Sequence, residues 1–393
     1  MIRSDKHENM MMYLIVFSII ILTSYFSFFL SIVLIALLLV FFENPIIRGG
    51  VALFSVISLS YLQSDFIPDS DSLQYLNYFK SVYFNLHLEE QLLSRTLEFA
   101  WQAYILALSK VIHPEFFFFF NTLALYSLAM FVSYKLDSGR GTYLMIFLLF
   151  CFLGFSNNLN FLIRQYYASI FIVLFFIYWE KCTFKKVSIY MISLGFHLSS
   201  VIYLPLLSRR FVSFLNKRTT AIIIFSFACS FLISLDTISF IYQKFQGSII
   251  VDRLRYYDNS ESSSSIFSIY FLEKILVIIL VLKVELNNLT RTERYFRALL
   301  IYSFSISLIF ANIAVLSERL GMIYTLFLGL FLFIPIKYFD KISFFKIKVN
   351  PILIFYFYLP LRIVFWGVSN ENTHIINYFN GNILSVGFNS FFS

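Results

Sequence analysis

The amino-acid sequence predicts an all-α protein that crosses a membrane many times. Of its 393 residues, 59% are hydrophobic and only 13% are charged, whereas a soluble domain carries roughly 25% charged residues. The chain also holds about a dozen apolar runs, most of them close to the ~20 residues that a membrane-spanning helix needs. Several connecting segments are strongly basic and others are acidic, a pattern typical of loops on opposite sides of a membrane.

The apolar runs place candidate spanning helices along the whole chain. The first two runs are continuous, and a tight hairpin fits them better than one long tilted helix. Neither an internal repeat nor a soluble domain is recognisable, so residues 1–393 are predicted to form one integral membrane domain of about 11–13 hydrophobic helices. The candidate runs lie at roughly 11–25, 27–43, 47–63, 98–112, 116–134, 142–156, 161–179, 187–207, 219–236, 266–284, 298–316, 320–336 and 351–367.

Charge and cysteine content exclude several other classes. The net charge of +8 is accounted for by basic loops, so we expect no nucleic-acid partner. Cys151, Cys182 and Cys229 lie in or near apolar segments without a Cys-x-x-Cys pair. They are predicted to be packing residues rather than a disulfide or metal framework. The first apolar run lacks a small-residue cleavage site, which predicts a membrane anchor rather than a cleaved signal.

The distribution of Lys and Arg in short loops predicts the orientation of the chain. Basic loops stay on the cytoplasmic side of a membrane. The acidic segment 64–97 and the long segment 237–265 are therefore predicted to be the two outer loops. The inner loops are the basic stretches at 181–186, 208–218, 283–297 and 337–348.

Two candidate spans conflict with that orientation. The run 187–207 lies between two basic loops and holds His197 and Pro205, which suits a broken or re-entrant helix buried in protein. The run 98–112 is short and carries Glu98, which suits an interfacial or re-entrant helix on the outer face. The alternative is that both runs cross fully and the basic loop between them faces out.

The cations singled out on the predicted outer face are all arginines. Arg164 and Arg319 each lie at the start of a candidate span, and Arg253 and Arg255 lie in the outer segment 237–265. A planar guanidinium suits a phosphate or carboxylate, and a helix N-terminus also favours an anion. Ionisable residues within spans are costly and usually face the interior or a cavity. Together these features predict an outward-facing site for a diphosphate or another anionic group.

Each of these residues also has a plainer interpretation. An arginine at a helix start can snorkel to lipid headgroups, and a histidine such as His197 on an apolar helix is often a structural hydrogen-bonding residue. Asp71 fits a turn or a cap in "PDSDS". The agreement of the unusual residues on one predicted face favours a shared site. Two tyrosine pairs fit interfacial aromatics, namely Tyr166–Tyr167 and Tyr256–Tyr257.

Four motifs, in order and spacing, resemble the EpsG-like group of Wzy-type O-antigen and exopolysaccharide polymerases. They are "DSDSLQY", "LIRQYYASIFIV", "GFHLSSVIYLP" and "SERLGMIYTLFLGLFLFIP". The family pattern is Asp-x-x-x-Tyr, Arg-Gln-x-x-Ala, Phe-His-x-Ser with a later Pro, and an Arg-Leu-x-x-Tyr-like element that this chain matches one residue more loosely. The resemblance covers roughly 65–336. The matching residues are Asp71, Tyr75, Arg164, Gln165, Ala168, Phe196, His197, Ser199, Pro205, Arg319, Leu320 and Tyr324.

The resemblance implies a glycosyltransferase of GT-C-like architecture in the bacterial inner membrane. It would transfer a growing polysaccharide from undecaprenyl diphosphate to a hydroxyl of the next lipid-linked repeat unit, at the periplasmic face. The expected partners are these lipid-linked oligosaccharides, the lipid bilayer, a chain-length regulator and a flippase. No cofactor is expected.

The same expectation assigns roles to the unusual residues. The arginines would hold the donor diphosphate without a metal, although "DSD" at 69–71 is the nearest approach to a metal motif. His197 would act as a base or as a hydrogen-bond donor to the diphosphate, and Asp71 would position the acceptor. The expected catalytic residues are His197, Asp71 and Arg164, and the expected substrate-binding residues are Arg319, Arg253, Arg255, Gln165, Tyr256, Tyr257 and Tyr75.

Three other classes compete with this expectation. A lipid-sugar flippase would also use charges within the membrane, but internal repeats are expected in such transporters. An O-antigen ligase would use the same donor, with a longer outer loop richer in Arg and His than "VDRLRYYDNSESSSS". A membrane-bound acyltransferase would need a site for a cytoplasmic thioester, and no convincing one is recognisable.

Overall fold

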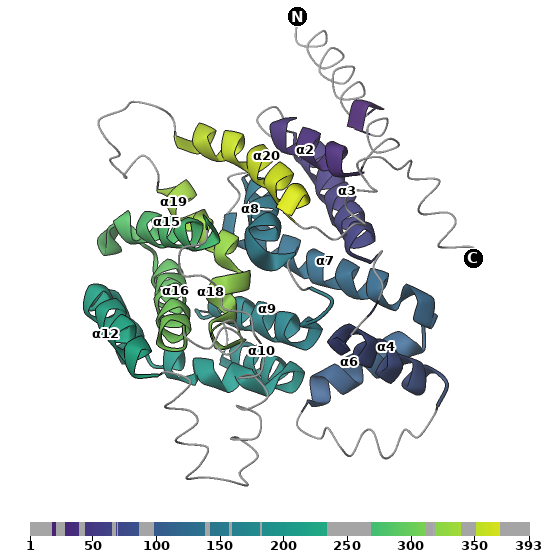
Figure 1. Cartoon of the computed structure of the whole chain (residues 1–393), viewed down its shortest axis with the longest axis horizontal. Coiled ribbons are helices and arrows are strands. Elements are labelled where there is room, and N and C mark those ends of the chain that lie inside the picture. Colours follow the sequence, from purple (N-terminus) through teal and green to yellow (C-terminus); the bar gives the residue numbers. More distant parts are fainter. Residues whose placement is uncertain are drawn as a thin grey trace, which may run out of the picture.

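The computed structural model describes the part of the chain that holds most of the candidate spans. The described residues are 18–20, 28–38, 44–64, 68, 70–85, 98–137, 142–156, 159–180, 183–233, 269–311, 317, 319–338 and 351–369. Across these ranges every regular element is a helix and no strand occurs. The all-α prediction is confirmed for them (Figure 1).

The helices follow one another with short connections. Their bounds are α2 (Phe28–Leu38), α3 (Pro45–Ser64), α4 (Ser70–Tyr83), α6 (Phe99–Ser109), η2 (Pro114–Phe116), α7 (Phe117–Asp137), α8 (Tyr143–Phe150), η3 (Cys151–Phe155), α9 (Ile163–Ile177), α10 (Thr183–Phe196), η4 (Leu198–Leu207), α11 (Arg209–Lys217), α12 (Thr219–Leu232), α15 (Ile269–Lys283), η5 (Leu286–Asn288), α16 (Arg291–Ile309), α18 (Met322–Leu326), η6 (Leu328–Leu332), α19 (Phe333–Lys337) and α20 (Pro351–Ser369).

Helices from the two halves of the chain pack together. At the top of Figure 1, α2 and α3 lie beside α20, and α3 also packs along α7. Ile32 and Ile35 of α2 and Leu359 and Ile363 of α20 have no exposed surface. In the centre, α9 contacts α7, α10 and α16, so α9 runs through the middle of the described helices.

Two described helices are long and apolar enough to cross a membrane without a break. These are Pro45–Ser64 and the continuous pair Pro114–Asp137. The pair Leu198–Leu207 and Arg209–Lys217 would make a third span, but it is bent by 80°. The other apolar helices among the described residues are shorter, so fewer of them are uninterrupted spans than the sequence predicts. These helices, together with the overall hydrophobicity, fit a polytopic membrane protein.

Breaks in the helices have local causes. Gly154 ends the first broken segment with a φ of 154°, which L side chains rarely adopt, and a Cβ there would lie 2.6 Å from the Thr325 carbonyl oxygen. This close approach seats η3 against the segment that holds α18 and η6. The predicted span 320–336 is accordingly divided into three short helices.

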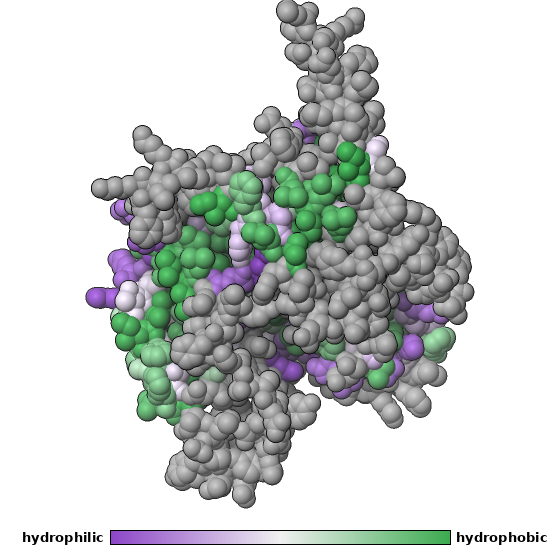
Figure 2. All heavy atoms as spheres, turned by 45° about the horizontal axis from the view of Figure 1, so that its top comes forward, coloured by the Kyte–Doolittle hydropathy of each residue, from purple (hydrophilic) through white to green (hydrophobic). Residues whose placement is uncertain are grey.

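Apolar side chains remain on the surface of several helices. Figure 2 shows hydrophobic residues gathered in patches on one face, with hydrophilic residues at the margins. Phe357 and Leu361 of α20 and Phe231 and Leu232 of α12 each expose 70% or more of their surface. Exposed apolar patches of this kind are typical of surfaces that face lipid or a partner. Inside, Arg362 is 5% exposed and pairs with Glu273 at 2.8 Å.

Three sequence predictions meet a different local structure. The predicted outer loop 64–97 contains the helix α4, because Tyr75, Phe79 and Val82 form a buried stripe at helical spacing. The predicted span 298–316 begins earlier, at Arg291, because Thr290 and Glu293 form a reciprocal capping box. The predicted break in 187–207 is confirmed at His197, where α10 ends and η4 begins.

The cysteines can be placed in part. Cys151 is buried and Cys229 is partly buried, and both are free thiols. Cys182 lies outside the described residues. The prediction that the cysteines are packing residues agrees with the position of Cys151 among the side chains of η3.

Candidate active site

Arg164 lies in the first turn of α9, with its side chain mostly buried. Its Nη1 forms an ion pair with Glu98 Oε2. Its Nε donates to the Tyr75 hydroxyl at 3.4 Å, and its guanidinium carbon lies 5.4 Å from the centroid of the Tyr75 ring. The exposed fractions of the Arg164 and Glu98 side chains are 22% and 16%. An arginine that only snorkelled to headgroups would not be enclosed by a carboxylate and an aromatic ring.

Glu98 is a site residue that the sequence reading did not assign. It directly precedes α6, whose position is set by contact with α10. A Cβ on Gly195 of α10 would lie 2.7 Å from the Phe99 ring and 2.8 Å from Ala100 Cβ. Only a glycine lets the two helices approach this closely, and that approach brings Glu98 to Arg164. The available signal was a single carboxylate at the start of an apolar run.

His197 lies where the chain leaves α10 with an extended backbone. Its φ and ψ are −156° and 128°, so the helical hydrogen-bond pattern stops there. The Ser193 and Ser200 hydroxyls, 2.8 Å apart, bridge the break. The Ser193 hydroxyl also donates to the Ala168 carbonyl at 2.8 Å, which ties the break to α9. His197 is therefore held at a fixed place beside α9.

The hydrogen bonds of His197 indicate its tautomer. Its Nδ1 accepts from the Ser199 backbone N–H at 3.1 Å, so the proton of a neutral imidazole lies on Nε2. His197 Nε2 lies 3.4 Å from Gln165 Nε2, and the buried Gln165 Oε1 has no hydrogen-bond partner. Exchanging the amide oxygen and nitrogen of Gln165 would let Oε1 accept from His197 Nε2–H. The pair then acts as one polar unit.

Asp71 and Arg319 form a second, more open ion pair. Asp71 lies in the first turn of α4, one turn before Tyr75, and its Oδ2 is 3.8 Å from Arg319 Nη2. The side chains are 45% and 32% exposed. The segment that carries Arg319 is held by the Tyr203 hydroxyl of η4, which donates to the Leu320 carbonyl at 3.4 Å.

The two arginines lie near the same histidine. The charges of Arg164 and Arg319 both act on His197 through space. Arg164 and Tyr75 are joined by a hydrogen bond, and Tyr75 shares α4 with Asp71. Residues far apart in the sequence thus form one cluster, which we name the arginine site: Asp71, Tyr75, Glu98, Arg164, Gln165, His197 and Arg319.

Aromatic and amide groups form the wall behind the arginine site. The Tyr75 ring meets Trp101 edge to face at 5.5 Å, and Tyr167 stacks on Phe196 at 4.8 Å. The Tyr167 hydroxyl donates to the Tyr104 hydroxyl at 2.9 Å. Tyr166 and Tyr167 are 0% and 2% exposed, so this pair packs in the interior and does not form an interfacial belt.

The remaining predicted residues are divided between the core and the undescribed part of the chain. Tyr324, the least secure motif residue, is 2% exposed and packs on Phe304 at 4.8 Å between ring centroids. No group of three or more metal-ligating side chains occurs within the described ranges. The predicted substrate-binding residues Arg253, Arg255, Tyr256 and Tyr257 lie outside the described residues, as does Asp69.

The arginine site has the groups needed to hold an anion and a hydroxyl. Two guanidinium groups provide planar donors suited to phosphate oxygens, and the tautomer of His197 adds a neutral N–H donor. The half-exposed Asp71 carboxylate is an acceptor for a hydroxyl. Each arginine is paired with a carboxylate of the chain, so an entering anion would compete with Glu98 and Asp71 for these donors.

Comparison with known proteins identifies one family. The model of the EpsG family matches residues 50–380, which include every residue of the arginine site. No curated protein and no solved structure matches the chain.

Proposed function

The chain belongs to the EpsG family, and from that premise we propose that it polymerises lipid-linked oligosaccharide repeat units into a surface polysaccharide. The family supports a polysaccharide polymerase, a function of the glycosyltransferase kind. The observation that carries the proposal is the arginine site, where Arg164, Arg319, His197 and Asp71 come together from four segments.

The proposed reaction transfers a glycan between two lipid diphosphate carriers. A hydroxyl oxygen of the acceptor repeat unit attacks the anomeric carbon of the donor, and a new glycosidic C–O bond forms. The C–O bond between that carbon and the undecaprenyl diphosphate breaks, and the diphosphate leaves with the electron pair. The hydroxyl proton passes to a base, so charge and atoms balance. Negative charge grows on the leaving diphosphate oxygen.

Arg164 and Arg319 stabilise that growing charge in the proposed mechanism. Preorganised donors aimed at developing charge are worth most where water is excluded, and the side chain of Arg164 is mostly buried. Glu98 and Tyr75 hold the Arg164 guanidinium in one orientation. The guanidinium is therefore in place before the donor arrives, which avoids reorganisation during the reaction.

His197 and Asp71 take the two remaining roles. The His197 Nε2–H, with Nδ1 engaged by Ser199, favours a hydrogen-bond donor to the diphosphate over a base. Asp71 is the more exposed of the two carboxylates, and we assign it to binding the acceptor hydroxyl. The proposed orientation, with basic loops in the cytoplasm, puts this chemistry on the periplasmic side of the inner membrane.

A deletion strain tests the proposed function. We expect lipopolysaccharide or capsule from the deletion strain to collapse from a ladder to core plus one repeat unit. The wild-type gene should restore the ladder and Arg164→Ala should not, with both proteins inserted in equal amounts. A bare core without a single-unit band would instead indicate a flippase or a ligase. An intact ladder with Arg164→Ala would exclude Arg164 from the reaction.

A further inference from the structure

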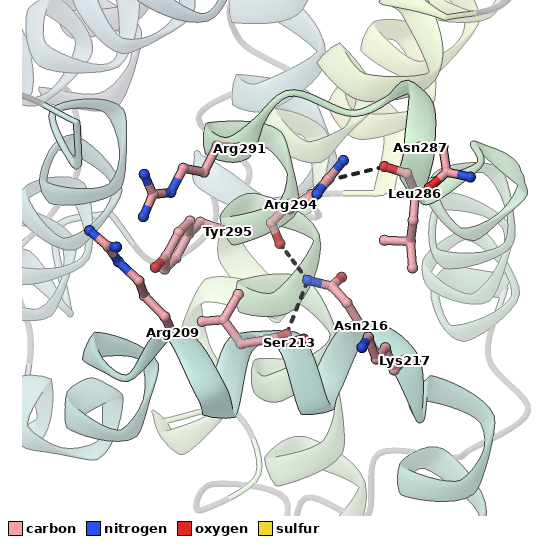
Figure 3. A pocket seen from close by; sticks show the side chains of 10 residues that line it. Arg209, Ser213, Asn216, Lys217, Leu286, Asn287, Arg291, Arg294 and Tyr295 are labelled. Carbon is pink, nitrogen blue, oxygen red and sulfur yellow. Dashed lines mark hydrogen bonds between the residues drawn. The ribbon is translucent and has the colours of Figure 1, made fainter.

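A basic pocket lies between α11 and the start of α16, away from the arginine site. Its probe-filled volume is about 280 Å³. Ten described residues line it, and four of these are cations while none is a carboxylate. The cations are Arg209, Lys217, Arg291 and Arg294. Figure 3 shows Arg209 from one side and Arg291 from the other converging beside the Tyr295 hydroxyl.

The cations of this pocket have few acidic partners. Arg291 meets Glu180 only at 4.0 Å, with both side chains about half exposed. The nearby Glu293 is 3% exposed and is engaged by Lys337 and the Tyr338 hydroxyl. The first turn of α10 adds Lys186, which lies 5.0 Å from the centroid of the Trp179 ring. Local positive charge at the pocket is therefore in excess, which favours an anionic ligand.

Asn216 adds a polar requirement to the pocket. Its Nδ2 donates to the Arg294 carbonyl at 2.9 Å and to the Val212 carbonyl at 3.1 Å. Its Oδ1 is buried and has no hydrogen-bond partner, and Asn216 is 7% exposed. A buried acceptor left unpaired costs free energy, so a ligand that carries a hydroxyl donor as well as an anionic group fits the pocket best.

Apolar surface begins immediately beyond the pocket. The helix α12 starts two residues after Lys217, and its exposed face is apolar: Ile224, Phe225, Phe227, Phe231 and Leu232 are 51–72% exposed. In Figure 1, α12 lies at the edge of the molecule. A ligand with an anionic end in the pocket and hydrocarbon chains along α12 would satisfy both surfaces. Such a ligand is a lipid.

We propose that this pocket binds the phosphate headgroup of an anionic, hydroxyl-bearing phospholipid, with its acyl chains along α12. Arg209 and Arg291 contact the phosphate, and Asn216 receives the headgroup hydroxyl. The proposed orientation puts the pocket at the cytoplasmic leaflet, where basic pockets between helices suit anionic headgroups. This binding is independent of the polymerase reaction.

Lipid titration of the full chain tests the proposal. Native mass spectrometry of detergent-purified protein would measure binding of phosphatidylglycerol and phosphatidylcholine. We expect the wild type to prefer phosphatidylglycerol, and the double variant Arg209→Gln with Arg291→Gln to lose affinity by roughly 25-fold, about fivefold for each cation near an anionic lipid. Arg294 is left unchanged because its Nε donates to the Leu286 and Leu289 carbonyls and closes the turn before α16.

Matched variants give the proposal a sharp boundary. Arg210→Gln removes an exposed arginine of the same helix that does not line the pocket, and we expect its affinity to stay within twofold of the wild type. If the first double variant does not fold, Arg209→Gln with Lys217→Gln replaces it, with a loss of the same size expected. Equal losses in Arg210→Gln and either double variant would overturn the proposal, because binding would then be diffuse.

The source of the phosphate is tested separately. Calorimetry with inorganic phosphate alone should give no binding in the millimolar range. Binding of inorganic phosphate that is lost in the double variant would overturn the assignment to a lipid.

Discussion

The two ends of α9 present opposite arrangements of positive charge. At its first turn, the arginine site pairs Arg164 with Glu98 and Arg319 with Asp71. About 22 Å away along the 15-residue helix, Trp179 leads to Tyr295 at the wall of the basic pocket, 4.6 Å between ring centroids. There four cations line a cavity without a carboxylate among its described lining residues.

This difference separates a site built for turnover from a site built for occupancy. Where each cation already has a carboxylate partner, an anion must displace that partner, so it gains less from binding and can leave afterwards. Where the cations face one another, an anion relieves their repulsion and is retained. Catalysis benefits from the first arrangement because binding must favour the transition state over the bound substrate.

The largest effect is expected from removing the paired arginine. Arg164→Ala should lower polymer synthesis by roughly two to three orders of magnitude, as loss of an oriented donor to developing charge does elsewhere. Radiolabelled repeat-unit incorporation in membrane vesicles measures this rate. Arg210→Ala, an exposed arginine of α11, serves as the control and should retain wild-type activity. A rate above half of the wild-type value for Arg164→Ala would contradict the role.

A stability change of intermediate size is expected where α6 meets α10. Gly195→Ala should cost about 1–3 kcal/mol, because its Cβ would clash with Phe99 and Ala100. Thermal unfolding in detergent measures this loss. Gly49→Ala is the matched control, since a Cβ there meets nothing within 4 Å. Phospholipid binding at the basic pocket should be unchanged in Gly195→Ala, and equal unfolding temperatures for the two variants would contradict the packing argument.

A smaller effect is expected from neutralising the partner of Arg164. Glu98→Gln keeps a hydrogen-bond acceptor but removes the charge, so about 1.5 kcal/mol of orientation is lost, roughly a tenfold drop in rate. The same incorporation assay applies. A drop as large as that of Arg164→Ala would mean that Glu98 itself takes part in the chemistry.

The smallest effect is expected on stability at the open pair. Asp71→Asn breaks an ion pair whose atoms are 3.8 Å apart and whose side chains are substantially exposed, so the free energy of unfolding should change by less than about 1 kcal/mol. Unfolding temperature measures this directly. A loss larger than that of Gly195→Ala would show that the Asp71–Arg319 pair is a structural support and not an open, functional one.

Sequence patterns predicted the composition of the arginine site better than its geometry. The four motifs singled out Arg164, His197 and Arg319, because charged residues in apolar runs are conspicuous. Glu98 was not assigned, since its proximity to Arg164 depends on how α6 packs against Gly195, a contact with no local signal.

The same division holds for the helices. Long uniform apolar runs such as that of α3 were predicted within two residues at its N-terminal end. The division of 320–336 into short helices was not predicted, because it follows from close contact with η3 at Gly154. The start of α16 could have been predicted from Thr290 and Glu293, whose spacing is that of a capping box, but the charged residues after Thr290 suggested a loop.

Purified, reconstituted protein with a defined lipid diphosphate-linked repeat unit tests the central claim most directly. The rate of polymer formation would be compared for the wild type and for Arg164→Lys, at matched unfolding temperatures. We expect the wild type to build a ladder and Arg164→Lys to be at least ~100-fold slower, since a lysine keeps the charge but not the planar fork. Equal rates would contradict the claim that the Arg164 guanidinium holds the leaving diphosphate.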